Sequence, residues 1–428
     1  MNREELKKYI NSKDFVHMIN EVYHMDDLEY IETQKKRYED VLDKAYKIYG
    51  DGDYHFISSP GRTEICGNHT DHQNGMVIAA SINLDNVCVV KATKNNIATF
   101  TDDVFGVNKV DLSNLYPLET EKGNTKSIIR GIAARLQKLG YGIGGFDAFQ
   151  DVNVPVGSGL SSSACFEVLV TEIYNYFYND CNVSDIDRAI ISQWAENNYF
   201  GKPCGLMDQM AISVGGFVHI DFSSKEKPNI KKLDFNFKDY GYDIMVVNVK
   251  ANHADLTDEY AAMPNEMKKV ASFFKKEVLR ELDKKTFYDK IFDLRENISD
   301  DRAILRAIHF YYENDRVKSF AEAVENKNIK KVLDIINESG VSSFEYLQNV
   351  YVNSDSRRQP MSLALALSDD IKGDVGAHRV HGGGFAGTML AIVKNDMADN
   401  YISRISTLFG KDSVLKFCIR GVGTKVII

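Results

Sequence analysis

The segment Gly61–Gly75 reads GRTEICGNHTDHQNG and is the most informative stretch of this 428-residue chain. Between its three glycines it gathers a dense set of hydrogen-bonding side chains: Arg62, Glu64, Asn68, His69, Asp71, His72, Gln73 and Asn74. So many polar side chains are unsuited to a hydrophobic core. They suit either a polar surface turn or a site that grips a ligand rich in hydroxyl groups, and the segment alone does not decide between the two.

A second informative segment, Pro155–Ala164, reads PVGSGLSSSA and lies between an apolar strand pattern and a helical one. Gly157 and Gly159 allow backbone amides to approach a phosphate closely, and the triple serine then opens the helix. The first N–H groups of a helix and its dipole favour a bound anion. No lysine follows the second glycine, so this is not the GxxxxGK[ST] loop. The alternative is a flexible turn with Ser161 as an ordinary N-cap.

Two further segments carry candidate site residues. In Glu196–Gly216 an aspartate, Asp208, stands among apolar residues, where an unpaired carboxylate would be costly to bury. A basic partner such as Arg62 would keep it ionised, although an aspartate that merely caps the following helix is the simpler interpretation. The segment His381–Gly387, HGGGFAG, places four glycines before a strand. Such a run indicates either close backbone contact with a ligand or a tight turn.

Composition and charge narrow the class of protein. With 44% hydrophobic and 26% charged residues the chain is ordinary globular protein, and its net charge of −9 argues against a nucleic-acid partner. There is no apolar run of about 18 residues, so no membrane span is expected, and the N-terminus lacks the apolar region of a secretory signal. Six cysteines without metal-ligand spacing fit reduced thiols. We expect a soluble, cytoplasmic protein.

The hydrophobic pattern predicts an α+β protein, with strands and helices mixed rather than strictly alternating. Residues 1–50 form a charged helical extension, and a polar stretch at Ser223–Pro228 divides the rest into domains 51–225 and 226–428. Strands are expected at 86–93, 146–154, 243–250, 387–394 and 414–421. Helices are expected at 125–139 and 161–177, over most of 258–350, and between the last two strands.

Taken together, the segments resemble the galactokinase family of the GHMP small-molecule kinases. GRTEICGNHTDHQNG is similar to the family signature GRVNLIGEHTDYNGG, and PVGSGLSSSA is similar to its phosphate-binding motif. PCGLMDQ (Pro203–Gln209) resembles the segment with the catalytic aspartate, and GGGFAG (Gly382–Gly387) the third motif. HADLTDEY (His253–Tyr260) is similar to the family's HSLASSEY. The matches follow the family's order along most of the chain.

This resemblance implies a two-domain GHMP fold, with an N-terminal α/β domain, a ferredoxin-like C-terminal domain and the active site in the cleft between them. It implies phosphoryl transfer from ATP, with Mg²⁺, to the anomeric hydroxyl of a sugar. Separately from the resemblance, we expect a monomer or weak homodimer. The residues that match the family's motifs are, for catalysis, Asp208 and Arg62; for the sugar, Asn68, His69, Asp71, Gly205 and Tyr260; for ATP, Gly157, Ser158, Gly159, Leu160, Ser161, Ser162 and Ser163; and for the metal, Ser162, Ser163 and Glu196.

The sequence departs from the family at Asn68, where the signature has glutamate. That glutamate lies near the 6-hydroxyl of galactose in the family. Asparagine would not repel a carboxylate at C6, and its amide can donate to one. The family's galacturonate kinases resemble this chain there, so a uronic acid is the alternative substrate to galactose. Two further hypotheses are a catalytically silent sugar sensor on the same fold and a GHMP kinase for a non-sugar alcohol.

Overall fold

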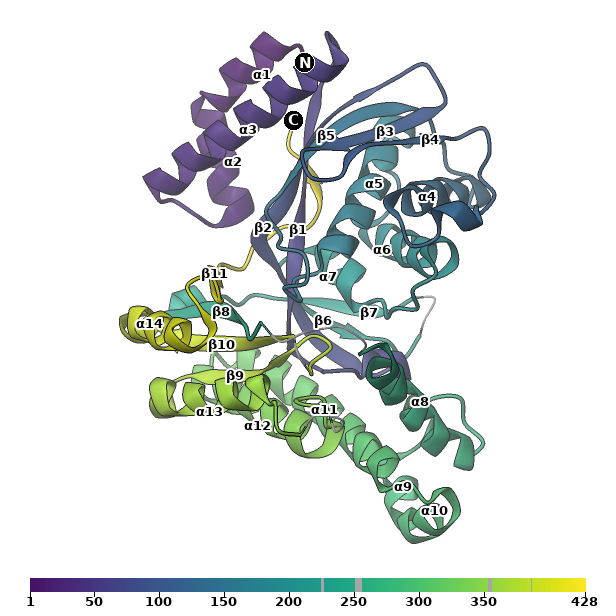
Figure 1. Ribbon diagram of the computed structural model, residues 1–428, viewed down its shortest axis with the longest axis vertical. Helices are drawn as coiled ribbons and strands as arrows, with labels where there is room; N and C mark the ends of the chain where they lie inside the picture. The colour runs from purple at the N-terminus through teal and green to yellow at the C-terminus, as the bar shows by residue number, and fades with distance from the viewer. Residues whose placement is uncertain (225–226, 251–255, 353–355, 386) are drawn as a thin grey trace.

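The computed structural model describes residues 1–224, 227–250, 256–352, 356–385 and 387–428, and Figure 1 shows an upper and a lower half joined by two long strands. These strands are β1 (His55–Cys66) and β2 (Met76–Ala92), which pair antiparallel from His55↔Val90 to Cys66↔Ile78. The segment Gly61–Gly75 is therefore only partly a turn. Its first six residues complete β1 and are buried, and the loop begins at Gly67.

The larger sheet has eight strands in the order β12-β1-β2-β5-β3-β4, and β6 extends it by pairing with β2 and β7. Its other strands are β3 (Ile97–Asp102), β4 (Gly106–Asp111), β5 (Phe146–Val152), β6 (Phe217–Asp221), β7 (Asn229–Leu233) and β12 (Lys425–Val426). Strands β7 and β12 join this sheet although both lie beyond residue 225. The end of the chain thus returns to pair with β1.

Four helices accompany this sheet in the upper half, on the right in Figure 1. They are α4 (Thr125–Lys138), α5 (Ser162–Tyr178), α6 (Asp185–Ala195) and α7 (Met207–Val214). The apolar faces of α4, α5 and α6, including Ile129 and Leu169, share a core with Phe146 and Ala148 of β5, whereas α7 packs on Val77 and Ala79 of β2. The helices expected at 125–139 and 161–177 are confirmed to within a residue or so.

The N-terminal extension is confirmed as helical and consists of α1 (Arg3–Ile10), α2 (Lys13–Tyr23) and α3 (Leu28–Tyr49). Each helix begins at a side-chain N-cap, from Asn2, Ser12 and Asp27 respectively. The helices pack on Val87, Val89 and Phe149 of the larger sheet. Arg37 of α3 also pairs with the buried Asp85 of β2, 2.6 Å from Nη1 to Oδ1. The extension is therefore an integral part of the upper half.

The lower half contains the smaller sheet, in the order β11-β8-β10-β9. Its strands are β8 (Tyr242–Asn248), β9 (Ala377–His381), β10 (Thr388–Lys394) and β11 (Val414–Phe417). Its helices are α8 (Thr257–Phe273), α9 (Lys284–Asp289), α10 (Ile291–Ile298), α11 (Asp301–Glu325), α12 (Ile329–Ser342), α13 (Pro360–Lys372) and α14 (Ala398–Phe409). The strands and helices expected here are present, although β8 ends two residues and β11 four residues earlier than expected. Strand β9 was not expected from the hydrophobic pattern.

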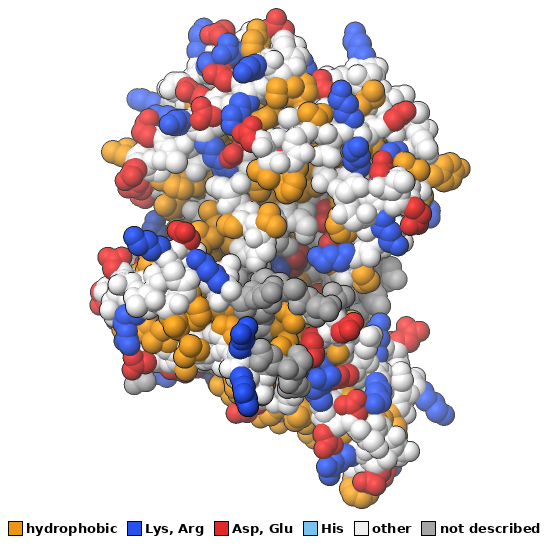
Figure 2. Space-filling view, in the orientation of Figure 1, with side chains coloured by type: hydrophobic (Ala, Val, Ile, Leu, Met, Phe, Trp, Pro, Cys, Tyr) orange, Lys and Arg blue, Asp and Glu red, His pale blue; other side chains and the backbone are white. Residues whose placement is uncertain are grey.

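Acidic and basic side chains are interspersed over the face shown in Figure 2, as the modest net charge leads one to expect. Within the described ranges, no helix combines the length and apolar character needed to cross a membrane. One large core cluster joins the halves, because it includes Ile78 and Ile82 of β2 together with Phe320 of α11 and Leu390 of β10. The loops at the ends of β1, β5 and β9 meet beside this core.

Candidate active site

The centre of the candidate site is an ion pair between Arg62 of β1 and Asp208 of α7. Arg62 donates from Nε to Oδ1 at 2.7 Å and from Nη2 to Oδ2 at 2.8 Å, so the two side chains meet in the bidentate fork geometry. Arg62 is almost completely buried, whereas the Asp208 side chain keeps 31% of its surface exposed. The carboxylate is therefore the accessible member of the pair. The sequence prediction that Arg62 is the partner of Asp208 is confirmed.

A third side chain completes this centre. Ser161 donates its hydroxyl to Asp208 Oδ2, and Arg62 donates its remaining Nη1 to the carbonyl of Gly159. Burial acts to raise the pKa of Asp208, but the charge of Arg62 and hydrogen bonds from Arg62 and Ser161 outweigh it, and the pKa lies below its usual range. Asp208 is thus a carboxylate at neutral pH. Ser161 occupies the N-cap position of α5, but its side chain makes no cap hydrogen bond to that helix, so it is not an ordinary N-cap.

The Pro155–Ser163 loop lies directly beside this pair. Gly157 and Gly159 both have left-handed backbone angles, with φ of 74° and 71°, which glycine adopts readily. Gly157 faces open space, while a side chain at Gly159 would collide with Thr388. Ser158 donates to the carbonyl of Pro155 at 2.6 Å, and Leu160 is fully buried in the core. The side chains of Ser158 and Leu160 therefore shape the loop and do not face a ligand.

Ser162 and Ser163 are the first two residues of the 17-residue helix α5, and their hydroxyls make no hydrogen bond to any described residue. Glu196, at the start of a π-helical turn (Glu196–Phe200), is buried and accepts a hydrogen bond from Gln209 Nε2 at 3.0 Å. Lys202 lies 3.4 Å from its other oxygen. Over the described ranges, no three His, Cys, Asp or Glu side chains form a metal-binding group. A cation here would need hydroxyl and nucleotide oxygens besides Glu196, which is the hard-oxygen set that Mg²⁺ takes.

Several residues expected to bind the sugar come together around Gly205, three residues before Asp208 in the chain. Asp71, in the short turn Asp71–Gln73, lies against Gly205 so closely that a Cβ on Gly205 would be 1.8 Å from Asp71 Oδ2. His69 adopts a left-handed backbone with φ of 58°, and its Nε2–H donates to the carbonyl of Gly383 at 3.3 Å. Burial lowers the pKa of His69 to about 3, so the ring is neutral. Asp71, Gly205 and His69 thus offer a carboxylate, a backbone and an imidazole within one small region.

Tyr260 of α8 reaches the same region from the lower half. Its hydroxyl donates to the carbonyl of Gly384 at 3.3 Å, and its ring packs edge-on against Phe385. A Cβ on Gly383 would lie 2.5 Å from the tyrosine ring, so this glycine is required by the contact. The glycine run after β9 is therefore a close backbone approach to Tyr260 and His69. Residues 253–255 of the matching segment and Ala386 lie outside the described residues.

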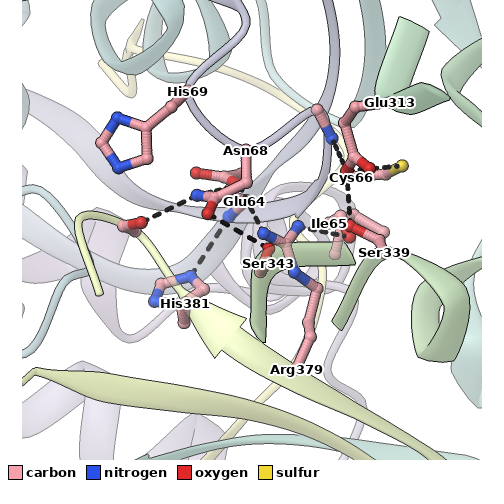
Figure 3. A network of polar contacts seen from close by, with 12 residues as sticks. Glu64, Ile65, Cys66, Asn68, His69, Glu313, Ser339, Ser343, Arg379 and His381 are labelled. Carbon is pink, nitrogen blue, oxygen red and sulfur yellow. Dashed lines mark hydrogen bonds and ion pairs between the residues drawn. The ribbon is translucent and has the colours of Figure 1, made fainter. Parts of the chain in front are cut away.

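Asn68 lies where the sequence analysis did not place it (Figure 3). Its side chain is fully buried and turned into the protein: Nδ2 donates to Glu64 Oε1 at 2.9 Å and to the carbonyl of Gly382 at 2.8 Å. Its Oδ1 accepts from Asn349 at 2.8 Å. Both amide hydrogens are thereby used, and neither is available to a carboxylate at C6 of a sugar. The expected contact between Asn68 and the substrate is not what the structure shows.

Two further ionisable residues, Glu64 and His381, lie buried beside Asn68 and were not expected to contribute to the site. Glu64 forms a buried ion pair with Arg379 of β9, 2.9 Å from Oε1 to Nη2, and burial raises its pKa against that attraction. His381 Nε2 accepts from the backbone N–H of Glu64 at 3.2 Å, so Nδ1 carries the proton and donates to Thr388. Burial lowers the pKa of His381 well below its usual range. In the sequence, the one indication that Glu64, Arg379 and His381 would meet here is that they lie within or next to the matched motifs.

Two family models match parts of the chain. The model described as "GHMP kinases N terminal domain" matches residues 127–216, and the model described as "Galactokinase galactose-binding signature" matches residues 46–92. The first range contains the Pro155–Ser163 loop, Glu196 and Asp208. The second contains Arg62 and the whole Gly61–Gly75 segment. Both matched ranges therefore contribute to the site described above.

Curated proteins and solved structures agree with these models. The galactokinase of Clostridium tetani is 29% identical over 381 residues, covering 85% of this chain and 90% of that protein. The galactokinase of Limosilactobacillus fermentum is 28% identical and covers 87% and 94%. A crystal structure of Lactococcus lactis galactokinase complexed with galactose superposes with a TM-score of 0.77 at 24% identity, covering 90% of this chain and 98% of that one. Methanococcus jannaschii mevalonate kinase shares the fold, with a TM-score of 0.61 at 14% identity.

Proposed function

We propose that this chain, which matches the models of the GHMP kinase N-terminal domain and of the galactokinase galactose-binding signature, is a galactokinase that transfers the γ-phosphoryl group of ATP to the anomeric hydroxyl of galactose. The observation that carries this proposal is the bidentate Arg62–Asp208 pair, which is hydrogen-bonded to the Pro155–Ser163 loop and stands three residues after Gly205, the residue that contacts Asp71. A sugar bound on one side and a triphosphate on the other would meet at this pair. The enzyme is accordingly an ATP-dependent sugar kinase.

Asp208 and Arg62 have different roles at the reacting centre. The lowered pKa of Asp208 makes it a weak base, so its main contribution is to accept a hydrogen bond from the C1 hydroxyl and orient that oxygen toward the phosphoryl group. Phosphoryl transfer passes through a loose transition state, and its catalysis depends on positioning and charge stabilisation more than on proton removal. Arg62 fixes the carboxylate and places positive charge beside the transferring group. Ser161 holds the carboxylate from the other side.

The Pro155–Ser163 loop would hold the triphosphate through backbone N–H groups and the positive end of α5. The open space at Gly157 and the hydroxyls of Ser162 and Ser163 support this placement. Those hydroxyls and Glu196 would hold Mg²⁺, which neutralises charge on the phosphates when bound. Gln209 donates to both Glu196 and Glu167 and thereby orients the Glu196 carboxylate. Gln209 directly follows Asp208 in the chain, so it connects the proposed metal ligand Glu196 to the residue that would orient the sugar hydroxyl.

For the sugar, Asp71 and the neutral His69 supply acceptor and donor atoms that suit hydroxyl groups, and Tyr260 borders the same space. The relatives support galactose as the substrate. The uronic acid alternative depended on an Asn68 amide that faces C6, and that amide is committed to Glu64 and Gly382. It is therefore not favoured.

A coupled assay of ADP release tests the proposal, with galactose, galacturonate, N-acetylgalactosamine and arabinose compared at equal concentration. We expect galactose to give the highest kcat/KM, and turnover to depend on added Mg²⁺. Absence of turnover with every sugar, despite measurable sugar binding by calorimetry, would instead indicate a sensor built on the kinase fold.

A further inference from the structure

Asn68 and Glu64 occupy each other's places in the family signature. The signature GRVNLIGEHTDYNGG has asparagine in the fourth position and glutamate in the eighth, whereas GRTEICGNHTDHQNG has Glu64 in the fourth and Asn68 in the eighth. The departure at residue 68 is therefore accompanied by the opposite change four residues earlier. The two side chains are also in direct contact, with Asn68 Nδ2 2.9 Å from Glu64 Oε1. One carboxylate and one amide remain, with their order reversed.

The reversed order places the carboxylate opposite a cation of the lower half (Figure 3). Arg379 of β9 is fully buried and donates to Glu64 Oε1 at 2.9 Å and to the carbonyl of Ile65 at 3.0 Å. Ile65 lies where the register between β1 and β2 shifts, between Glu64 and Cys66, so its carbonyl lacks a regular ladder partner. Arg379 therefore balances the buried charge of Glu64 and also supplies a hydrogen-bond donor for the Ile65 carbonyl in the irregular part of β1.

Asn68 extends the contact to two other elements of the lower half. It donates to the carbonyl of Gly382, at the start of the glycine run, and accepts from Asn349. Its backbone carbonyl accepts from His309 Nε2 of α11 at 2.9 Å. The next residue, His69, has a left-handed backbone conformation, contacts Gly383 of the glycine run, and is among the residues that we expect to bind the sugar. The position of His69 thus depends on how Asn68 is held.

We propose that Glu64 and Asn68 act as one exchanged pair that positions the Gly67–Gly75 loop against β9 and the glycine run. Asn68 is then a positioning residue and makes no contact with C6 of the substrate. The proposal rests on the proposed function, in that the Gly67–Gly75 loop is taken to hold the sugar. It implies that a glutamate at residue 68 is compatible with the chain only when residue 64 gives up its carboxylate, because Arg379 is the direct partner of that carboxylate, while the nearby Arg62 is already paired with Asp208.

The experiment is a double-mutant cycle of Asn68→Glu, Glu64→Asn and the two changes together, with Tm and galactose kinetics measured for each. Asn68→Glu places two buried carboxylates together, and Glu64→Asn leaves Arg379 without its partner. We expect each single change to lower Tm and raise the KM for galactose by about tenfold, while the double variant recovers most of both. If the losses in Tm and the increases in KM of the two single variants simply add in the double variant, the proposed pairing is overturned.

Glu322 of α11 and Asn326, the C-cap residue of that helix, supply a matched control, since they have the same residue types at the same spacing and both are exposed. The effects of the two changes at this exposed pair should be additive, and the KM for galactose should not change. If the double variant at 64 and 68 fails to fold, the isosteric Glu64→Gln tests the same charge pairing, and it should raise the KM for galactose while kcat at saturating sugar changes little. An unchanged KM and Tm in Glu64→Gln would count against the proposal.

A second measurement separates positioning from recognition of C6. In Asn68→Ala, kcat/KM is compared for galactose and 6-deoxygalactose. A positioning role lowers both values by the same factor, whereas a contact with the 6-hydroxyl would lower only the value for galactose and would refute the assignment. If the wild-type chain does not phosphorylate galactose, the proposed function fails. The Tm cycle still decides whether Glu64 and Asn68 act as a pair.

Discussion

Arg62 holds Asp208 through two parallel hydrogen bonds, 2.7 Å from Nε to Oδ1 and 2.8 Å from Nη2 to Oδ2. The arrangement joins β1 of the central pair of strands to the first turn of α7. It keeps the carboxylate ionised and fixes the direction of its oxygens, since burial alone would act to raise the pKa. A residue placed in this way is suited to orienting a hydroxyl group and poorly suited to taking up a proton.

Asp208→Asn should therefore reduce kcat by about two to three orders of magnitude, as the loss of a preorganised electrostatic contact does elsewhere. The KM for galactose should change little, because Asp71 and His69 remain in place. Steady-state kinetics with galactose and ATP check this, and the exposed Asp412→Asn serves as the control. A variant that retains wild-type kcat would remove Asp208 from the mechanism.

The contact between Gly205 and Asp71 gives a prediction about the sugar side alone. Gly205→Ala places a Cβ 1.8 Å from Asp71 Oδ2, so the carboxylate must move. We expect the KM for galactose to rise by about tenfold or more, while the KM for ATP stays near the wild-type value. The control is Gly52→Ala, where the new Cβ meets only the flexible end of Lys91. Equal increases in both KM values would contradict a role confined to the sugar.

The sequence predicted the parts of this site that depend on local pattern. Glycine spacing indicated the Pro155–Ser163 loop, and the isolated Asp208 among apolar residues correctly indicated a basic partner. The orientation of Asn68 could not be predicted, because it depends on Arg379 and Asn349, more than 280 residues away along the chain. A side chain within a motif faces the ligand or the interior according to partners that the motif does not contain. The same reason explains why β9 and the returning β12 were missed: short strands are defined by what they pair with.

The proposed metal ligand Glu196 gives a prediction with a readout besides activity. Glu196→Gln removes the charge but keeps the acceptor for Gln209. Because Mg²⁺ prefers charged oxygen ligands, the Mg²⁺ concentration that gives half-maximal stabilisation by ATP in thermal-shift titrations should rise by about tenfold. The exposed Glu119→Gln is the control. An unchanged Mg²⁺ requirement would exclude Glu196 as a ligand.

Buried neutral histidines around the Gly67–Gly75 loop should make the fold sensitive to acid. Burial lowers the pKa of His309 to about 4 and that of His69 to about 3. An unfolded histidine has a pKa of about 6.5, so above pH 7 neither state binds a proton and the full stability is present. As the pH falls below about 6.5 the unfolded chain takes up protons that the folded chain rejects, and stability falls by about 1.4 kcal/mol per pH unit for each such histidine, down to its folded pKa.

His309→Gln tests this assignment, since glutamine can still donate to the Asn68 carbonyl but does not titrate. The free energy of unfolding, measured by urea titration between pH 7 and 4.5, should fall less steeply in this variant than in the wild-type protein. The same substitution at the exposed His17 should leave the slope unchanged. If His309→Gln loses stability with falling pH as steeply as the wild type, then His309 is not a source of the acid sensitivity. The protons must in that case be taken up elsewhere, with His69 and His381 the next buried imidazoles to replace.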